Sequence, residues 1–228
     1  MKDLLRIIEK SQNHFHVLMN TINEQKNGLS LEQYQGYLSM QYHLNRGVQK
    51  HFYTVASHFS LAGRKILRDF LVNFALEEES HYEIAYRDLK NLGLEPKSVT
   101  IDIKLWWAHF DIVVHKSPFQ RLGACAVLEN ISGKSTQLVK DLMVATDFLS
   151  PRNTKFVAIH LHEELPHGDQ ILEVLNSIKL SESEYQDLLI GAEDGMTLYL
   201  RMLHHAIGAE NTFTNPAVIP IETPSPLK

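Results

Sequence analysis

The sequence predicts an all-α protein of seven helices. Apolar residues recur at spacings of three and four along most of the chain, which is the period of an amphipathic helix. Capping signals precede several of these runs, and no segment shows the strict alternation or the hairpin turns of strands. The expected helices cover residues 3–26, 30–58, 64–91, 102–115, 117–145, 150–178 and 181–208.

Short sequence signals mark where these expected helices begin and end. A capping residue or a Ser-Pro pair begins a helix, and glycine ends one, because glycine adopts the left-handed backbone that follows a last turn. The starts are Ser30 with Gln33, Asp102, Ser117-Pro118, Ser150-Pro151 and Ser181 with Glu184. The stops are Asn27-Gly28, Ala62-Gly63, Gly93 and Gly208.

Length and composition indicate one globular domain. The chain has 228 residues, of which 44% are hydrophobic, so residues 1–210 suffice for a single core. Residues 211–228 contain four prolines and are expected to form an extended or disordered tail. The net charge of −5, with scattered basic residues, argues against a nucleic-acid partner. A single cysteine, no signal peptide and no membrane-length apolar run predict a soluble, cytoplasmic protein.

Glu78 and His81 continue the core stripe of the third expected helix. Leu71 and Phe74 precede them at helical spacing, so a carboxylate and an imidazole take inward positions three residues apart. A buried carboxylate must be paired, protonated or bound to metal. The alternative is that the charge run 77–79 turns toward solvent.

Glu129 is the only charged residue in the segment from Leu122 to Gly133, LGACAVLENISG. Small residues surround it at helical spacing, which leaves room beside the carboxylate. Because lone buried charges are strongly disfavoured, Glu129 is either a metal ligand or part of a buried salt bridge.

The sixth expected helix carries the most specific pattern. His160, Glu164 and His167 lie at i, i+4 and i+7, so they share one face, and apolar residues flank them on the same stripe. Two imidazoles and a carboxylate suit iron, manganese or zinc. Ordinary surface residues are the alternative interpretation. Pro166 removes one backbone hydrogen bond and is expected to kink the helix.

Together the inward set contains three carboxylates and three histidines, close to the complement of a two-iron or two-manganese site. A ferritin-like bundle would need another glutamate from residues 30–58. No Asp or Glu occurs between Gln33 and Asp69, so the ligand count disfavours a ferritin.

The arrangement resembles the heme-oxygenase-like diiron oxidases, relatives of thiaminase II and pyrroloquinoline-quinone synthase. The resemblance covers residues 30–205 and rests on three motifs, which are LEEESHYEIAYRDL, AVLENI and the His-x3-(Asp/Glu)-x2-His run at residues 160–167. It implies a seven-helix heme-oxygenase-like bundle that holds two iron ions, with manganese as the other candidate metal. The implied ligands are Glu78, His81, Glu129, His160, Glu164 and His167.

Two departures from the family pattern affect the ligand assignment. Many members space the first pair as Glu-x6-His, but here Phe74 stands seven residues before His81, and the pair has the short form of members that act on fatty acids. Glu77 therefore stays open as a substitute for Glu78. The third motif often carries Asp where this chain has Glu164.

The resemblance implies an iron-dependent oxidoreductase that activates dioxygen to oxidise a small amino acid, amine or fatty acid. An external electron donor and a homodimer are compatible with it, and no nucleic-acid or membrane partner is expected. The alternatives are a metal-independent thiaminase-like hydrolase, a small-molecule binding protein, or an interaction protein with a vestigial metal site. Candidate residues for the substrate pocket are His43, Trp107, Cys125 and Arg201.

Overall fold

The computed structural model describes residues 1–25, 28–161 and 167–208. Within these ranges every regular element is helical, which confirms the all-α prediction. The expected domain end near residue 210, the tail 211–228, and Glu164 and Pro166 lie outside the described residues. The α-helices are α1 (Lys2–Asn23), α2 (Leu31–Asn45), α3 (Gln49–Ser57), α4 (Lys65–Glu78), α5 (His81–Asn91), α6 (Ile101–Lys116), α7 (Pro118–Asn130), α8 (Thr136–Ala145), α9 (Lys155–Leu161), α10 (His167–Ser177) and α11 (Glu182–Ala206), with short 3₁₀ turns at Phe59–Leu61 and Gly133–Ser135.

In the part of the chain that the structure describes, each of the seven expected ranges contains helix, but several are interrupted. The expected start at Ser150-Pro151 is wrong, because α9 begins at Lys155. The expected helix 30–58 breaks into α2 and α3 at Gly47, whose φ of 90° favours glycine. The expected helix 64–91 breaks into α4 and α5 at the turn 79–80. These two breaks lie at the same level, because α2 packs against α5 and α3 packs against α4.

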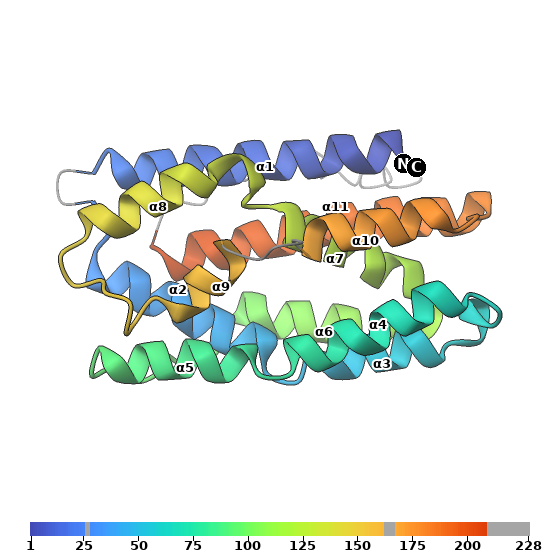
Figure 1. The fold of residues 1–228 in the computed structure, drawn as a ribbon, viewed down its shortest axis with the longest axis horizontal. Helices are drawn as coiled ribbons and strands as arrows, with labels where there is room; N and C mark the ends of the chain where they lie inside the picture. The colour runs from blue at the N-terminus through green and yellow to red at the C-terminus, as the bar shows by residue number, and fades with distance from the viewer. Residues whose placement is uncertain (26–27, 162–166, 209–228) are drawn as a thin grey trace, which may run out of the picture.

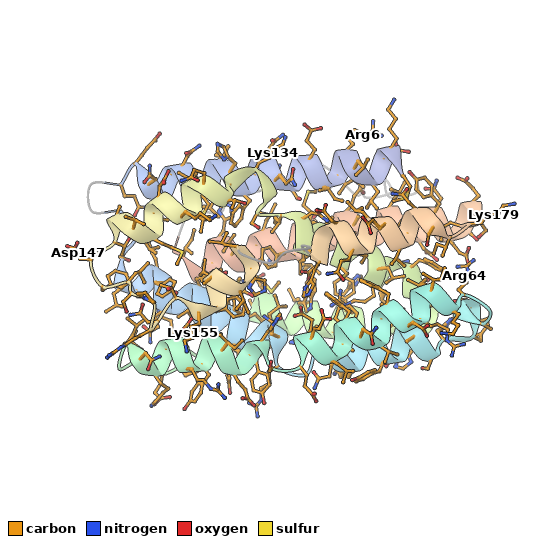
Figure 2. The ribbon with its side chains drawn as sticks, in the orientation of Figure 1. Arg6, Arg64, Lys134, Asp147, Lys155 and Lys179 are labelled. Atoms are coloured by element: carbon orange, nitrogen blue, oxygen red, sulfur yellow. The ribbon has the colours of Figure 1, made fainter. Side chains whose placement is uncertain are left out.

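The helices form three layers (Figure 1). α7, α10 and α11 run through the middle, α1 and α8 lie on one side, and α2 to α6 lie on the other. α11 contacts α1, α2, α6 and α7, so it is the central element of the core. Charged side chains such as Arg6, Lys134 and Lys179 lie at the periphery (Figure 2).

Glycines allow α7 and α11 to pack with their backbones in contact. A Cβ atom on Gly123 would collide with the backbone carbonyl of Leu188, and one on Gly191 would collide with that of Gln120. Gly195 lies against Ala124 in the same interface. The close approach fixes the position of α7, which carries Glu129.

We expect Gly191→Ala to lower the free energy of unfolding by about 2 kcal/mol or more, because the rigid backbone carbonyl of Gln120 cannot yield without separating the two helices. Glu193→Ala, at an exposed position of the same helix, serves as the control. Chemical denaturation of both variants tests this. Equal stability of Gly191→Ala and Glu193→Ala would contradict the described packing.

Candidate metal centre

Three helices bring ligand-type side chains to one point. Glu78 ends α4, Glu129 lies near the end of α7 and His167 begins α10. Each offers one ligand atom, and the three atoms lie within 4.8 Å of one another. Glu78 and His167 are buried, and the side chain of Glu129 is 19% exposed. The sequence predicts all three as ligands, and the structure brings them together.

His81 reaches the cluster across a break in the backbone. The spacing predicts one continuous helix with Glu78 and His81 on the same face, but α4 ends at Glu78 and α5 begins at His81. This expected continuity is wrong, and Ser80, a weak helix former, occupies the turn. The two side chains still meet, with His81 Nδ1 2.8 Å from Glu78 Oε2.

Both nitrogens of His167 face carboxylates. Its Nδ1 lies 3.2 Å from Glu78 Oε1 and 3.6 Å from Glu129 Oε2, while its Nε2 lies 2.9 Å from Glu77 Oε2. The Glu77 side chain is 54% exposed, whereas that of Glu78 is 6% exposed. The structure therefore places Glu78 inside the cluster and Glu77 behind His167, where a carboxylate orients an imidazole.

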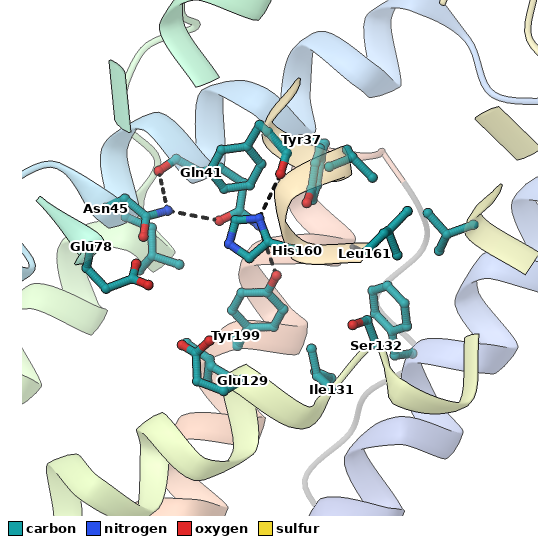
Figure 3. Close-up of a pocket in the computed structure, with 16 residues that line it drawn as sticks. Tyr37, Gln41, Asn45, Glu78, Glu129, Ile131, Ser132, His160, Leu161 and Tyr199 are labelled. Atoms are coloured by element: carbon teal, nitrogen blue, oxygen red, sulfur yellow. Dashed lines mark hydrogen bonds between the residues drawn. The ribbon is translucent and has the colours of Figure 1, made fainter. Parts of the chain in front are cut away.

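His160 lies at the edge of the site. Its ring centroid is 5.1 Å from that of His81, and it lines the same cavity as Glu78 and Glu129 (Figure 3). Its Nδ1 is 2.7 Å from the carbonyl oxygen of Phe156, one turn earlier. Because a carbonyl only accepts, Nδ1 donates this hydrogen bond, and Nε2 is the ring nitrogen that remains for another partner.

The buried carboxylates and imidazoles hold each other in charged forms. Burial raises the pKa of Glu78, but hydrogen bonds from His167 and His81 outweigh it, so the pKa lies below its usual range. Burial lowers the pKa of His167, but Glu129 and Glu78 outweigh it, so the pKa lies well above 6.5. These groups thus form an ion-paired cluster in the core, in which a cation can replace the proton on His167.

Asn130 braces α7 against α10 beside two of these residues. Its Nδ2 donates to the carbonyl of Gly168 at 3.2 Å, and its own carbonyl accepts from Gln12 Nε2 on α1 at 2.8 Å. A Cβ atom at Gly168 would lie 2.6 Å from Asn130 Oδ1, so a larger residue would displace this amide side chain and disturb its hydrogen bond to Gly168. The brace fixes the distance between Glu129 and His167.

A cavity of about 120 Å³ adjoins the cluster (Figure 3). Its lining includes Glu78, Glu129 and His160 together with apolar residues. Among the described residues that line it there is no lysine or arginine. The neutral polar groups in its lining are Tyr37, Gln41, Asn45, Ser132 and Tyr199.

Gln41 and Tyr199 form a bonded pair in this wall. Gln41 Nε2 donates to Tyr199 Oη at 3.0 Å, and burial raises the pKa of Tyr199 to about 12. Sequence reasoning missed both residues and Asn45. A signal existed, because Gln41 and Asn45 continue the buried stripe of Tyr34 and Leu38 at helical spacing, but neutral polar residues on a stripe attract less notice than charges.

None of the four residues expected at the substrate pocket lines this cavity. His43 Nε2 lies 2.8 Å from the Lys97 carbonyl and Trp107 Nε1 donates to the His43 carbonyl, so both are used outside the site. Arg201 pairs with Asp102 at 2.9 Å. Cys125 is buried, and burial raises the pKa of its thiol well above the usual value. These four residues therefore lie away from the cavity beside the cluster, and their role in binding a substrate stays a prediction.

Arg121 is buried on the stripe of α7 that leads to Glu129. It is 3% exposed, lies over the ring of Phe52 at 4.5 Å, and donates through Nε to His51 Nδ1 at 3.5 Å. His51 Nε2 in turn lies 2.9 Å from Asp111 Oδ1. Burial and the charge of Arg121 lower the pKa of His51 to about 4.

Solved structures with the same fold support the class. A domain of unknown function with a heme oxygenase-like fold from Shewanella denitrificans is 20% identical over 87% of this chain and 90% of that chain, with a TM-score of 0.71. A TenA homologue from P. horikoshii is 16% identical over 89% of this chain and 98% of that chain, with a TM-score of 0.60. No curated protein matches the sequence.

The fold and the buried cluster therefore define a helical protein of the heme oxygenase-like class with a carboxylate–imidazole site. The chain belongs to the family of iron-containing redox enzymes, whose model matches residues 35–200. The donor set fits that description, because carboxylate oxygens and imidazole nitrogens suit iron and manganese. None of the described helices is both long and apolar enough to span a membrane.

We expect acid to destabilise the protein through His51. Its pKa is about 4 in the folded chain and near 6.5 unfolded, so the unfolded state binds more protons between these values. The free energy of unfolding should then fall by on the order of 3 kcal/mol from this residue as pH decreases from 6.5 to 4. Denaturation at several pH values should show a shallower slope for His51→Gln than for wild type. The exposed His115→Gln should keep the wild-type slope, and an unchanged slope in His51→Gln would refute this role.

Proposed function

We propose that this chain is a non-haem oxidase or oxygenase that binds two iron ions and activates dioxygen to oxidise a small organic substrate. The observation that carries the proposal is the meeting of Glu78, Glu129 and His167 from three helices beside a cavity. His81 and His160 adjoin them, and Glu164, the sixth proposed ligand, is assigned from its sequence spacing alone.

Each residue has a separate part in this proposal. Iron held by these residues would supply electrons for the reduction of dioxygen, and an external donor would have to replace those electrons. Glu78 directs one carboxylate oxygen toward His81 and the other toward His167, so it presents one oxygen to each imidazole. Glu77 holds the far nitrogen of His167 and so fixes the ring.

The cavity wall indicates how a substrate would be held. With no cationic side chain among its described lining residues, the cavity has no fixed partner for a substrate anion other than the metal centre. Tyr199 accepts from Gln41, so its own hydroxyl hydrogen is left to donate to a polar group of the substrate. The aromatic and aliphatic residues of the lining would reduce the access of water to the reacting centre.

A cysteine-dependent hydrolase on the same fold is disfavoured. The TenA homologue shares the fold at 16% identity, which says nothing of chemistry in this chain. A nucleophilic thiol needs a lowered pKa and access to the cavity. Cys125 has a raised pKa, is buried and does not line the cavity.

We expect purified protein, stripped and then titrated anaerobically with Fe(II), to bind close to two ions per chain. His167→Ala and His160→Ala should each lose at least one ion, because each removes one imidazole donor from the proposed set. Elemental analysis counts the ions and separates iron from manganese. His115→Ala, an exposed histidine on α6, is the matched control. Two ions in both ligand variants would refute the assignment.

We expect Glu129→Gln to keep the fold and to slow dioxygen consumption by the iron-loaded protein at least about tenfold, because an amide is a poorer ligand than a carboxylate for a hard cation. Oxygen electrode traces and thermal melts of the metal-free protein measure the two effects, with exposed Glu193→Gln as control. Unchanged dioxygen consumption beside a loss of about 3–5 kcal/mol without metal would limit Glu129 to its ion pair with His167 and contradict its role as a ligand.

A further inference from the structure

Asp88 is a fully buried carboxylate outside the metal cluster. It lies two turns after His81 on α5 and is 0% exposed. Its Oδ2 accepts the backbone N–H of Phe156 at 2.8 Å. Since a buried carboxylate is costly unless its oxygens accept hydrogen bonds, its retention here calls for an explanation.

The bonded partner is in the first turn of α9, the seven-residue helix that carries His160. The first N–H groups of a helix have no partner within the helix, so a carboxylate from another helix both satisfies one of them and favours the positive end of the helix dipole. The segment before α9 is held from the same side, because Tyr34 Oη donates to the Asn153 carbonyl at 2.8 Å and Asn91 Nδ2 donates to the Arg152 carbonyl at 2.5 Å.

Phe156 links Asp88 to His160. Its N–H donates to Asp88, and its carbonyl accepts from His160 Nδ1 at 2.7 Å. The position of Phe156 therefore determines both where the His160 ring lies and which nitrogen carries the hydrogen. α5 thus joins two parts of the site, with His81 at its start and, two turns later, the residue that anchors the helix of His160.

We propose that Asp88 is a positioning residue that holds α9 so that His160 Nε2 faces the metal centre. The inference rests on the proposed function, because it takes His160 as a ligand. Asp88 does not touch the cluster itself, and it acts through the Phe156 backbone.

The test compares three variants. Asp88→Leu removes the acceptor at similar volume, and Asp88→Asn keeps one acceptor oxygen. Asp102→Leu removes another buried carboxylate, which pairs with Arg201 and His205 away from the cavity. Anaerobic Fe(II) titration, amide exchange of residues 155–161 and ¹⁵N resonances of the His160 ring are measured for each.

Asp88→Leu should bind one of the two ions at least tenfold more weakly, exchange amides 155–161 faster and lose the single ring tautomer of His160. Asp88→Asn should stay within threefold of wild type, and Asp102→Leu should lose stability but keep both ions. If Asp88→Leu does not fold, Asp88→Ser, whose side chain is too short to reach Phe156, replaces it with the same expectations.

The proposal would be overturned if Asp88→Leu bound iron and exchanged amides 155–161 as the wild type does. It would also be overturned if Asp102→Leu weakened iron binding and sped up this exchange as much as Asp88→Leu does. If the proposed function is wrong, the wild-type protein itself will bind fewer than two ions. In that case the exchange rates and the His160 tautomer still decide whether Asp88 holds α9.

Discussion

The burial of the Glu78 carboxylate is the constraint on which the rest of this structure depends. A charge in a helical core is tolerated only with partners at close range. Here the partners are two imidazoles, His81 at 2.8 Å and His167 at 3.2 Å, which come from different helices. The turn between α4 and α5 and the start of α10 must therefore meet at one point, and this meeting defines the site.

Close packing between helices fixes the positions of the segments that carry these side chains. Gly123 and Gly191 let α7 and α11 approach until their backbones touch, and Gly168 lets α10 approach Asn130 on α7. Gly168 directly follows His167, while Gly123 and Gly191 lie about two helical turns before Glu129 and Tyr199 on their helices. Small residues in the packing interfaces thus help to position the functional ones, because a methyl group added at Gly123 or Gly191 would meet the backbone of the other helix.

The cluster and His160 differ in how they are held. Glu78, Glu129 and His167 pair with one another within the core, whereas His160 is exposed at the end of a short helix. Its position depends on hydrogen bonds from α2 and α5 to backbone groups at and before the start of α9. The cluster is therefore held by ion pairs among its own residues, whereas His160 is held by hydrogen bonds from neighbouring helices to the backbone of its segment.

The sequence by itself determined the helical class and the charged residues of the cluster. Glu78, Glu129 and His167 replace core residues on apolar stripes, and a charge on such a stripe is visible without knowing any neighbour. Only the tertiary structure decided the rest. The break at Ser80, the cavity wall of Gln41 and Tyr199, and the displacement of His43 and Arg201 from the cavity depend on which helices meet and at what rotation. Periodicity reports the buried face of one helix, but the partner across that face is chosen by packing between segments far apart in the chain.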